Sequence, residues 1–325
     1  MTHRVSPRRR AASAWTARTL APPGPACQSH PVSILDLTGK NAFVTGVSDD
    51  GGFAWAIAKA LGAAGANVYL ACHPRVVGIV ERFVTKDKYA ESRKLPYGVE
   101  GELEVKGIIP CDVEFDRAED VPEERRASKG YAGLDASIAG SFAKFDELTA
   151  GGGVDILIHS VAFSPEIQKP HLEVSRAAYL QAVSISSYSM VALVREALPR
   201  MEGRDASVVG LSYLASQRVT PGYGGGMATA KAALECDARS LAWFAGEAGV
   251  RVNILSPGAY PSRAAKSIGA IQDMVAQSAQ RSPLRRAISA EEVADACLFM
   301  CSPLARGITG DVVYVDAGFH AMSAL

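Results

Sequence analysis

The chain has 325 residues, of which 48% are hydrophobic and 21% charged. This composition is typical of a globular protein, and no run approaches the roughly 18 apolar residues of a membrane helix, so we expect no membrane span. The six cysteines form no C-x-x-C pair. They therefore indicate neither a zinc site nor a disulfide scaffold, and we expect no bound metal and a reduced compartment.

The N-terminal segment is basic. Five arginines come before the first acidic residue, Asp36: Arg4, Arg8, Arg9, Arg10 and Arg18. The segment is rich in Arg, Ala and Ser and lacks the apolar core of about 7–15 residues found in secretory signals. Residues 1–33 are therefore predicted to be an organelle transit peptide, with a disordered basic tail as the alternative; composition leaves plastid and mitochondrion both open.

The rest of the chain is acidic. Subtracting the five arginines from the 34 basic residues leaves 29 against 34 acidic residues, a net charge of −5. A mature chain of that sign is not expected to bind nucleic acid.

From Lys40 onward, short β-rich runs alternate with alanine-rich helical segments. Seven strands are predicted, at 41–46, 67–72, 105–111, 154–162, 207–213, 251–257 and 311–318. Several are continuous apolar runs, as in strands buried on both faces. Helices are predicted between them, among them 54–66, 175–201, 230–249 and 290–302. The expected fold of residues 34–325 is a single Rossmann-type α/β domain with a doubly wound parallel sheet of about seven strands.

One segment breaks this rhythm. Residues 84–134 are polar and charged around the third strand, and they are interpreted as a polar surface insertion without a catalytic part.

The first strand is followed by a glycine-containing turn and a helix, in TGVSDDGGFAWAIAKAL. Gly46 closes the strand and Gly51 and Gly52 open the turn, where a pyrophosphate could rest on the helix N-terminus. The spacing is not G-x-G-x-x-G, so a plain strand–turn–helix is the alternative. The acidic residue expected after the second strand for binding the adenosine ribose is absent. His73 and Arg75 lie there instead, which leaves NADPH open as a coenzyme.

The next two strands end in further candidates. Asp112, after the third strand, is placed to hydrogen-bond an adenine edge, although it could also be a cap. His159, at the end of the fourth strand, is interpreted as a core residue in preference to a catalytic base. The residues from Ser160 to Ala162 are small where a nicotinamide ribose would pass.

The fifth strand leads into LSYLASQRVTPGYGGGMATAK, which contains two tyrosines and a lysine. Tyr213 emerges at the carboxyl edge of the sheet, where open α/β sheets bind ligands. The glycines 224–226 delay a helix that begins near Met227, and they allow a bend that brings Tyr223 toward the helix of Lys231. An ammonium beside the phenol is expected to lower the pKa of Tyr223. Two phenols and an ammonium suit a reaction in which negative charge develops on a carbonyl oxygen.

These motifs resemble those of the enoyl-[acyl-carrier-protein] reductases, a branch of the short-chain dehydrogenase/reductase superfamily. The resemblance runs from about Leu35 to the C-terminus and rests on TGVSDDGGFAWAIAKAL, HSVAFSPEIQKPHLEVSRAAYL, SISSYS, the Tyr-x7-Lys with PGYGGGM, GVRVN and SRAAKSIG. It is greatest for the plastid form, which carries an insertion like residues 84–134, so it implies the plastid stroma.

The resemblance implies NADH-dependent reduction of the 2,3 double bond of a trans-2-enoyl thioester on acyl-carrier protein, in type II fatty-acid biosynthesis, by a homotetramer. Tyr223 would stabilise an enolate, Lys231 would bind the nicotinamide ribose and Tyr213 would line the acyl pocket. Ser164, Tyr213 and Tyr223 would contact the substrate. The cofactor would contact Gly46, Gly52, Phe53, His73, Asp112, Val113, Ser160, Val161, Lys231, Tyr260, Pro261, Ser262, Arg263 and Ala264.

The carrier protein is acidic, so a local basic patch is expected. Its candidates are Arg263, Lys266, Arg281, Arg285 and Arg286.

The sequence departs from the family pattern after the sixth strand. Pro257-Gly258-Ala259-Tyr260 stands where Ala-Gly-Pro-Leu/Ile is usual, so a tyrosine adds bulk near the nicotinamide. His73 replaces the tryptophan usual in plastid forms, which weakens adenine stacking. Two other functions remain open: a carbonyl-reducing short-chain dehydrogenase, and a catalytically inactive dinucleotide-binding scaffold. The wide Tyr–Lys spacing argues against the first, and the intact Tyr213, Tyr223 and Lys231 argue against the second.

Overall fold

The computed structural model describes residues 35–323, apart from the side chains of Ala264 and Ser267. The expected transit peptide, residues 1–33, lies outside the described residues and stays a prediction.

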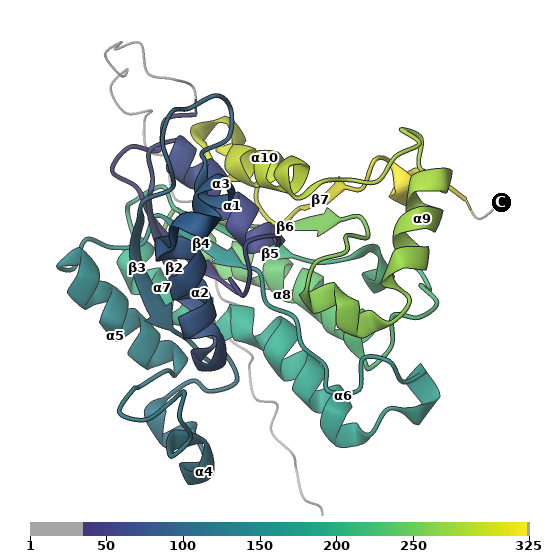
Figure 1. Ribbon diagram of the computed structural model, residues 1–325, viewed down its shortest axis with the longest axis horizontal. Coiled ribbons are helices and arrows are strands. Elements are labelled where there is room, and N and C mark those ends of the chain that lie inside the picture. The colour runs from purple at the N-terminus through teal and green to yellow at the C-terminus, as the bar shows by residue number, and fades with distance from the viewer. Residues whose placement is uncertain (1–34, 324–325) are drawn as a thin grey trace, which may run out of the picture. The chain divides into compact units, whose positions relative to one another are not determined.

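A seven-stranded parallel sheet organises the fold, as predicted (Figure 1). The strands are β1 (Asn41–Thr45), β2 (Asn67–Cys72), β3 (Val105–Pro110), β4 (Ile156–His159), β5 (Ser207–Leu211), β6 (Arg251–Pro257) and β7 (Val312–Val315). Their order across the sheet is β3-β2-β1-β4-β5-β6-β7. The chain leaves β1 toward one edge and returns at β4 toward the other, so ligands are expected at the carboxyl ends of β1 and β4.

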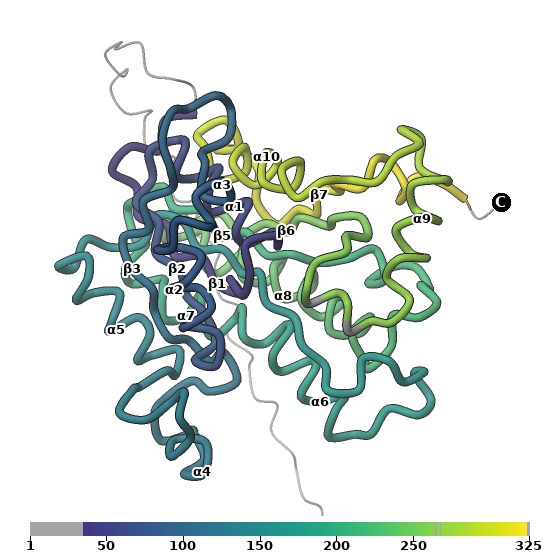
Figure 2. Tube along the Cα trace, in the orientation of Figure 1, coloured from purple at the N-terminus to yellow at the C-terminus, as the bar shows by residue number. Residues whose placement is uncertain are grey.

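Helices cover both faces of this sheet. The described residues form the helices α1 (Phe53–Ala63), α2 (Val77–Thr85), α3 (Ala90–Arg93), α4 (Glu123–Arg126), α5 (Ile138–Thr149), α6 (Arg176–Val183), α7 (Ser189–Met201), α8 (Met227–Gly246), α9 (Ile271–Arg281) and α10 (Ala290–Cys301). One core unites α1, α2 and α10 on the first face, and a second unites α5, α7 and α8 on the other. Figure 2 shows α10, from the end of the chain, beside α1, from its beginning.

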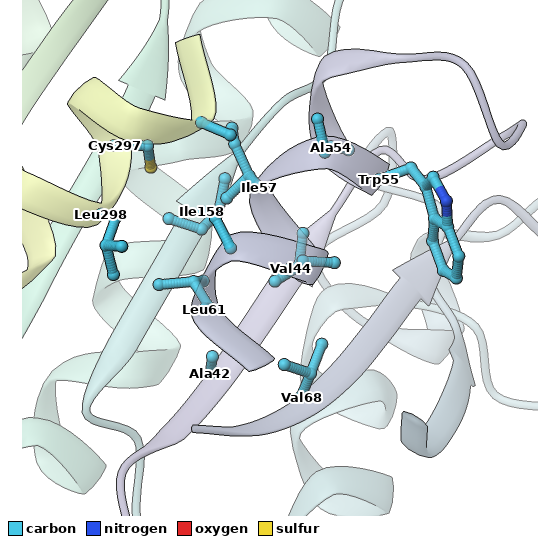
Figure 3. Packing of buried hydrophobic residues seen from close by; sticks show 14 of the residues in the cluster. Ala42, Val44, Ala54, Trp55, Ile57, Leu61, Val68, Ile158, Cys297 and Leu298 are labelled. Carbon is cyan, nitrogen blue, oxygen red and sulfur yellow. The ribbon is translucent and has the colours of Figure 1, made fainter. Parts of the chain in front are cut away.

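The strands alternate between these two cores, which explains their continuous apolar sequences. In β1, Ala42 and Val44 belong to the core of the first face, whereas Phe43 belongs to that of the second. Phe43 stacks on Phe142 of α5 with ring centroids 4.7 Å apart. Figure 3 shows the first face, where α1 and α10 pack onto β1, β2 and β4. The carboxyl edge is thereby held on both sides by packed side chains.

The helix predicted at 175–201 is interrupted. A π-helical turn, Ser184–Tyr188, separates α6 from α7. Serine side chains stabilise this wider turn: Ser189 donates to the Ile185 carbonyl, and Ser187 donates to Asp237 on α8. Among the described residues, the stretch Arg176–Met201 is the one long and apolar enough to cross a membrane, but 56% of its most apolar window is buried inside the protein. Its apolarity is therefore explained by packing in the second core.

The polar segment 84–134 lies mostly at the surface, as predicted, although parts of it are packed. Its first part contacts the core, since Arg93 is buried and donates to the carbonyls of Phe83 and Lys86. Its second part has a small apolar cluster of its own, formed by Phe115, Val121, Tyr131 and Ala136.

Candidate active site

The first strand and the fourth strand meet at a glycine. Gly46 has φ +79°, and a Cβ built on it would lie 1.9 Å from the Ser160 carbonyl oxygen. Any larger residue would push the ends of β1 and β4 apart. The sequence-predicted contacts Gly46 and Ser160 are therefore neighbours at the point where the strand order reverses.

The turn after Gly46 leaves a helix N-terminus free for an anion. The buried carboxylate of Asp49 accepts a hydrogen bond from the Gly51 amide at 2.9 Å, which fixes the turn. Gly52 is the N-cap of α1, and no side chain caps the helix. The amides of its first turn are therefore available to a phosphate group, and the site fits the pyrophosphate of a dinucleotide.

Tyr260, the residue that departs from the family pattern, reaches across to this turn. Its hydroxyl donates to the Gly51 carbonyl at 3.1 Å, and its ring centroid lies 4.9 Å from that of Phe53. Ser262 follows, and its hydroxyl oxygen accepts from the Ala265 amide at 3.1 Å. The segment after β6 is thus tied to the start of α1.

The expected adenine end lies at β2 and β3 and contains a hydrogen-bonded cluster. Asp112 is buried, and its Oδ2 accepts from the Tyr131 hydroxyl at 2.5 Å and from Arg125 at 3.2 Å. His73 Nε2 lies 3.5 Å from the same oxygen and 3.1 Å from the Tyr131 hydroxyl. Although burial opposes it, hydrogen bonds from His73 and Tyr131 lower the pKa of Asp112 to about 2. The Glu114 amide also donates to Asp112, so the carboxylate caps a turn as well.

The two tyrosines of the fifth strand's loop lie together. The ring centroids of Tyr213 and Tyr223 are 4.9 Å apart, at an interplanar angle of 57°. Both rings pack against an apolar cluster formed by Ala259, Ile271 and Met274, which comes from the segment after β6 and from α9. The pair is therefore enclosed by residues far away in the sequence.

This enclosure reverses the expected pKa shift. Burial, and then the neighbouring Tyr213, raise the pKa of Tyr223 above its usual range, and burial raises that of Tyr213 to about 12. The expectation that Lys231 lowers the pKa of Tyr223 is therefore wrong. Tyr223 keeps its proton at neutral pH, which makes it a hydrogen-bond donor.

Lys231 is buried at the end of β5. Its ammonium donates to the Leu211 carbonyl at 2.6 Å, and burial lowers its pKa to about 8, while Glu235 acts to raise it. His159, the rejected base, is fully buried with Nε2 2.7 Å from the Ser189 hydroxyl. Burial and then the charge of Lys231 lower the pKa of His159 to about 3, so it is neutral, in agreement with a core role.

The three glycines do more than delay the helix, which starts at Met227 as predicted. A Cβ on Gly224 would lie 2.1 Å from the Lys169 carbonyl oxygen, and one on Gly225 would lie 2.4 Å from the Ser164 hydroxyl. Ser164 itself is buried and donates to the Gly225 carbonyl at 2.7 Å. Its hydroxyl therefore joins the 164–169 loop to the glycines.

The other predicted cofactor residues follow the strand ends. Val113 is buried after β3, and Val161 is half-buried after β4. Pro261 and Arg263 are exposed after β6, where only the backbone of Ala264 is described.

Sequence reasoning missed several polar residues of the site. Asp49, Arg125, Tyr131 and Glu235 were not singled out. Most of them lie in polar stretches, where the sequence does not indicate which side chains will form hydrogen bonds with one another. Glu235 alone had a usable signal, because it lies one helical turn after Lys231 on the same face.

Comparison with known proteins agrees with this geometry. The family model described as Enoyl-(Acyl carrier protein) reductase matches residues 114–320. The chain is 46% identical over 292 residues to the chloroplastic enoyl-[acyl-carrier-protein] reductase [NADH] of Arabidopsis thaliana. The matched region covers 89% of this chain and 73% of that protein. A rice chloroplastic enzyme, reductase 1 of Oryza sativa, is also 46% identical, over 89% of this chain and 76% of its own length.

Solved structures give the same result. The Plasmodium berghei enoyl-acyl-carrier-protein reductase with triclosan superposes with a TM-score of 0.82 at 34% identity, covering 87% of this chain and 98% of that one. The Anaplasma phagocytophilum reductase in complex with NAD has a TM-score of 0.71 at 31% identity, covering 89% and 94%. The chain belongs to the enoyl-(acyl carrier protein) reductase family of short-chain dehydrogenases/reductases.

Proposed function

We propose that this chain is an NADH-dependent enoyl-[acyl-carrier-protein] reductase, which reduces the 2,3 double bond of a trans-2-enoyl thioester in type II fatty-acid biosynthesis. The observation that carries the proposal is the pair of contacting rings, Tyr213 and Tyr223, beside the helix that holds Lys231. Relatives and solved structures named as NADH-dependent or NAD-bound reductases support it.

Each polar group has a role that follows from its protonation state. Tyr223, which is half-buried and protonated at neutral pH, donates a hydrogen bond to the thioester carbonyl oxygen and stabilises the negative charge that develops there. Tyr213 packs against that phenol and lines the acyl chain. Lys231, bound to the Leu211 carbonyl, keeps further donors for ribose hydroxyls. NADH, when bound, supplies the hydride to the β-carbon.

The dinucleotide would lie along the carboxyl edge of the sheet. The α1 N-terminus would hold the pyrophosphate, with Gly46, Gly52 and Phe53 close to it. The cluster of His73, Asp112 and Val113 would hold the adenine, and the segment from Tyr260 to Ala264, together with Ser160 and Val161, would flank the nicotinamide half.

NADH consumption with crotonyl-CoA or a crotonyl-carrier protein tests this function against a carbonyl-reducing dehydrogenase. We expect saturable loss of NADH absorbance with the enoyl thioesters and none with simple ketones. Activity confined to ketones would favour the carbonyl reductase. Binding of NADH without turnover of either substrate class would favour a scaffold.

An acyl-carrier protein would deliver the substrate, and exposed basic residues support this. Arg263, Lys266, Arg281 and Arg285 are exposed near α9. Arg286 is already paired with both carboxylate oxygens of Glu292, so its positive charge is partly neutralised and it should attract an acidic carrier less strongly. Charge-reversal of Lys266 should raise the KM for the carrier-bound substrate and leave that for crotonyl-CoA unchanged.

We also propose a homo-oligomer, a tetramer by analogy with the family. Two large side chains on α8, Trp243 and Phe244, are 71% and 72% exposed, which is unusual for aromatic residues in an isolated subunit. A Trp243→Lys variant should shift the mass measured by light scattering toward smaller species, and an unchanged mass would exclude this face as the contact.

The proposed location is the plastid stroma, reached through a transit peptide in residues 1–33. The chloroplastic names of the plant relatives support it. A fluorescent fusion to residues 1–40 should enter plastids, and import into mitochondria would contradict the proposal.

A further inference from the structure

Glu235 is a buried carboxylate to which the catalytic scheme assigns no role. It is 4% exposed and lies on α8 one turn after Lys231, on the same buried face. Carboxylates are seldom buried unless hydrogen bonds or an opposite charge compensate for lost hydration. The partners of Glu235 therefore indicate what it does.

Three donors from one short segment surround this carboxylate. The hydroxyls of Ser212 and Ser216 each donate to Oε1 at 2.6 Å. The side-chain amide of Gln217 donates to Oε2 at 3.3 Å. All three flank Tyr213 closely in the sequence, so Glu235 gathers the segment that carries a proposed substrate residue.

Two successive turns of α8 thus fasten the end of β5. Lys231 donates to the Leu211 carbonyl, and Glu235 accepts from the residues that follow. Tyr213 lies between these two attachments, with its ring against Tyr223. The placement of the tyrosine pair relative to Lys231 therefore depends on Glu235.

Glu235 also supplies charge. Burial lowers the pKa of Lys231 to about 8, and in the described part of the chain Glu235 is the carboxylate that opposes this shift. Among the described residues, His159 on β4 interacts with Lys231, and Tyr314 on β7 interacts with Glu235. Burial keeps both neutral, since it lowers the pKa of the histidine and raises that of the tyrosine. Burial also raises the pKa values of Tyr213 and Tyr223, so these residues add no charge.

We propose that Glu235 is a positioning residue of the reductase, which fixes Tyr213 against Tyr223 and keeps Lys231 in its ammonium form for the cofactor. The proposal rests on the roles proposed above for Tyr213 and Lys231. A carboxylate suits both tasks, because a glutamine could offer one oxygen to the two serines but would turn its NH2 group toward the Gln217 amide and would carry no charge.

The test is the pH dependence of NADH affinity in the full chain, followed by NADH fluorescence from about pH 6.5 to about pH 9.5. For the wild type we expect affinity to fall as pH rises through the pKa of Lys231. In Glu235→Gln this fall should begin about one pH unit lower, because the opposite charge is gone. With crotonyl-CoA, kcat should also fall about 10-fold or more, since a small misplacement at the site is costly.

Two further variants separate this inference from the proposed function. Glu247→Gln removes an exposed carboxylate at the C-terminus of the same helix and should match the wild type in both measurements. Lys231→Met should abolish the pH-dependent fall; if the fall persists, the assignment of Lys231 fails and this inference with it. If Lys231→Met behaves as expected but a folded Glu235→Gln keeps the wild-type pH dependence and kcat, the inference alone is overturned.

A purely structural role would lower thermal stability and kcat without moving the pH dependence, and that result would also overturn the charge assignment. If Glu235→Gln does not fold, Ser216→Ala removes one attachment without changing charge. It should lower kcat with crotonyl-CoA several-fold and leave the pH dependence of NADH affinity unmoved. Wild-type kcat in that variant would refute the positioning role.

Discussion

The two ends of the sheet's carboxyl edge hold their polar groups in different ways. At the β5 end, Lys231 and Glu235 are both 4% exposed and are held by backbone and hydroxyl groups one helical turn apart. At the β2–β3 end, the side chain of His73 is 37% exposed and that of Arg125 28%, and they meet one buried carboxylate, Asp112.

This difference matches the roles proposed for the two ends, catalysis at the first and adenine recognition at the second. Buried groups with altered pKa values and fixed partners suit a step in which charge develops, because a low local dielectric strengthens each interaction. A half-exposed cluster built by a polar insertion suits binding of an adenine, where each contact contributes modestly. We therefore expect substitutions at the first end to change kcat and those at the second to change the KM for NADH.

The largest effect should come from Gly225→Ala, at the catalytic end. Gly225 has φ +63°, and an added Cβ would lie 2.4 Å from the Ser164 hydroxyl and 2.6 Å from the Ile167 Cα. Because strain and overlap add, unfolding free energy should fall by about 3 kcal/mol and turnover should be lost. Denaturant unfolding measures the first.

Gly78→Ala is the matched control. Gly78 lies within α2, and a Cβ there meets no atom within 4 Å. This change should stabilise by about 0.5–1 kcal/mol, as expected for an exposed helical glycine. Equal destabilisation by both substitutions would contradict the packing assigned to the glycines.

The next effect is at the recognition end. Tyr131→Phe removes the hydroxyl that donates to Asp112, so the KM for NADH should rise about 3–10-fold while kcat stays within about 2-fold. Steady-state kinetics measure both. Tyr97→Phe is the control, since Tyr97 also lies in the insertion and its hydroxyl donates a similarly short bond, of 2.6 Å, to Asp295 on α10. If Tyr131→Phe lowered kcat without changing the KM for NADH, the assignment of recognition to this end of the sheet would be contradicted.

The same cluster predicts an acid dependence of stability. Asp112 has a pKa of about 2 in the folded protein, below its ordinary value of 3.8. Its contribution to stability is therefore complete above about pH 4 and is lost as pH falls from 4 toward 2. In Tyr131→Phe, which lacks one of the hydrogen bonds that lower this pKa, the contribution should be smaller. The thermal midpoints of the wild type and of Tyr131→Phe should converge as pH falls from 4 toward 2. A difference in midpoint that stays constant over this range would show that it does not come from the ionisation of Asp112.

The smallest effect should come from Tyr260, between the two ends. Tyr260→Phe keeps the ring against Phe53 but loses the hydrogen bond to the Gly51 carbonyl. A single exposed hydrogen bond contributes little, so NADH affinity should change about 2–3-fold. Titration of NADH fluorescence tests this, and a change beyond about 10-fold would mean that the hydroxyl contacts the cofactor directly.

The sheet was predictable because its signal is local. Continuous apolar runs such as ILIH in β4 identify strands buried on both faces, and the glycines ahead of Met227 identify the start of α8. The strand ends then bring Gly46, His73, Asp112 and Tyr213 to one edge by topology alone.

The site was less predictable because its electrostatics depend on packing. The pKa of Tyr223 depends on Ala259, Ile271 and Met274, which are 36 to 51 positions away in the sequence. The insertion's contribution was missed since nothing local connects Tyr131 to Asp112, 19 residues earlier. A pKa shift caused by burial can be predicted only from the tertiary structure, because the sequence shows only which residues are adjacent along the chain.

The role of Tyr223 is tested most directly by comparing the turnover of Tyr223→Phe with that of the wild type, with crotonyl-CoA and NADH at neutral pH. The phenylalanine keeps the packing against Tyr213 and removes the donor. We predict a loss of about 100-fold or more in kcat, with NADH affinity within about 2-fold of the wild type. Turnover close to that of the wild type would contradict the claim that a half-buried, protonated Tyr223 stabilises the developing charge.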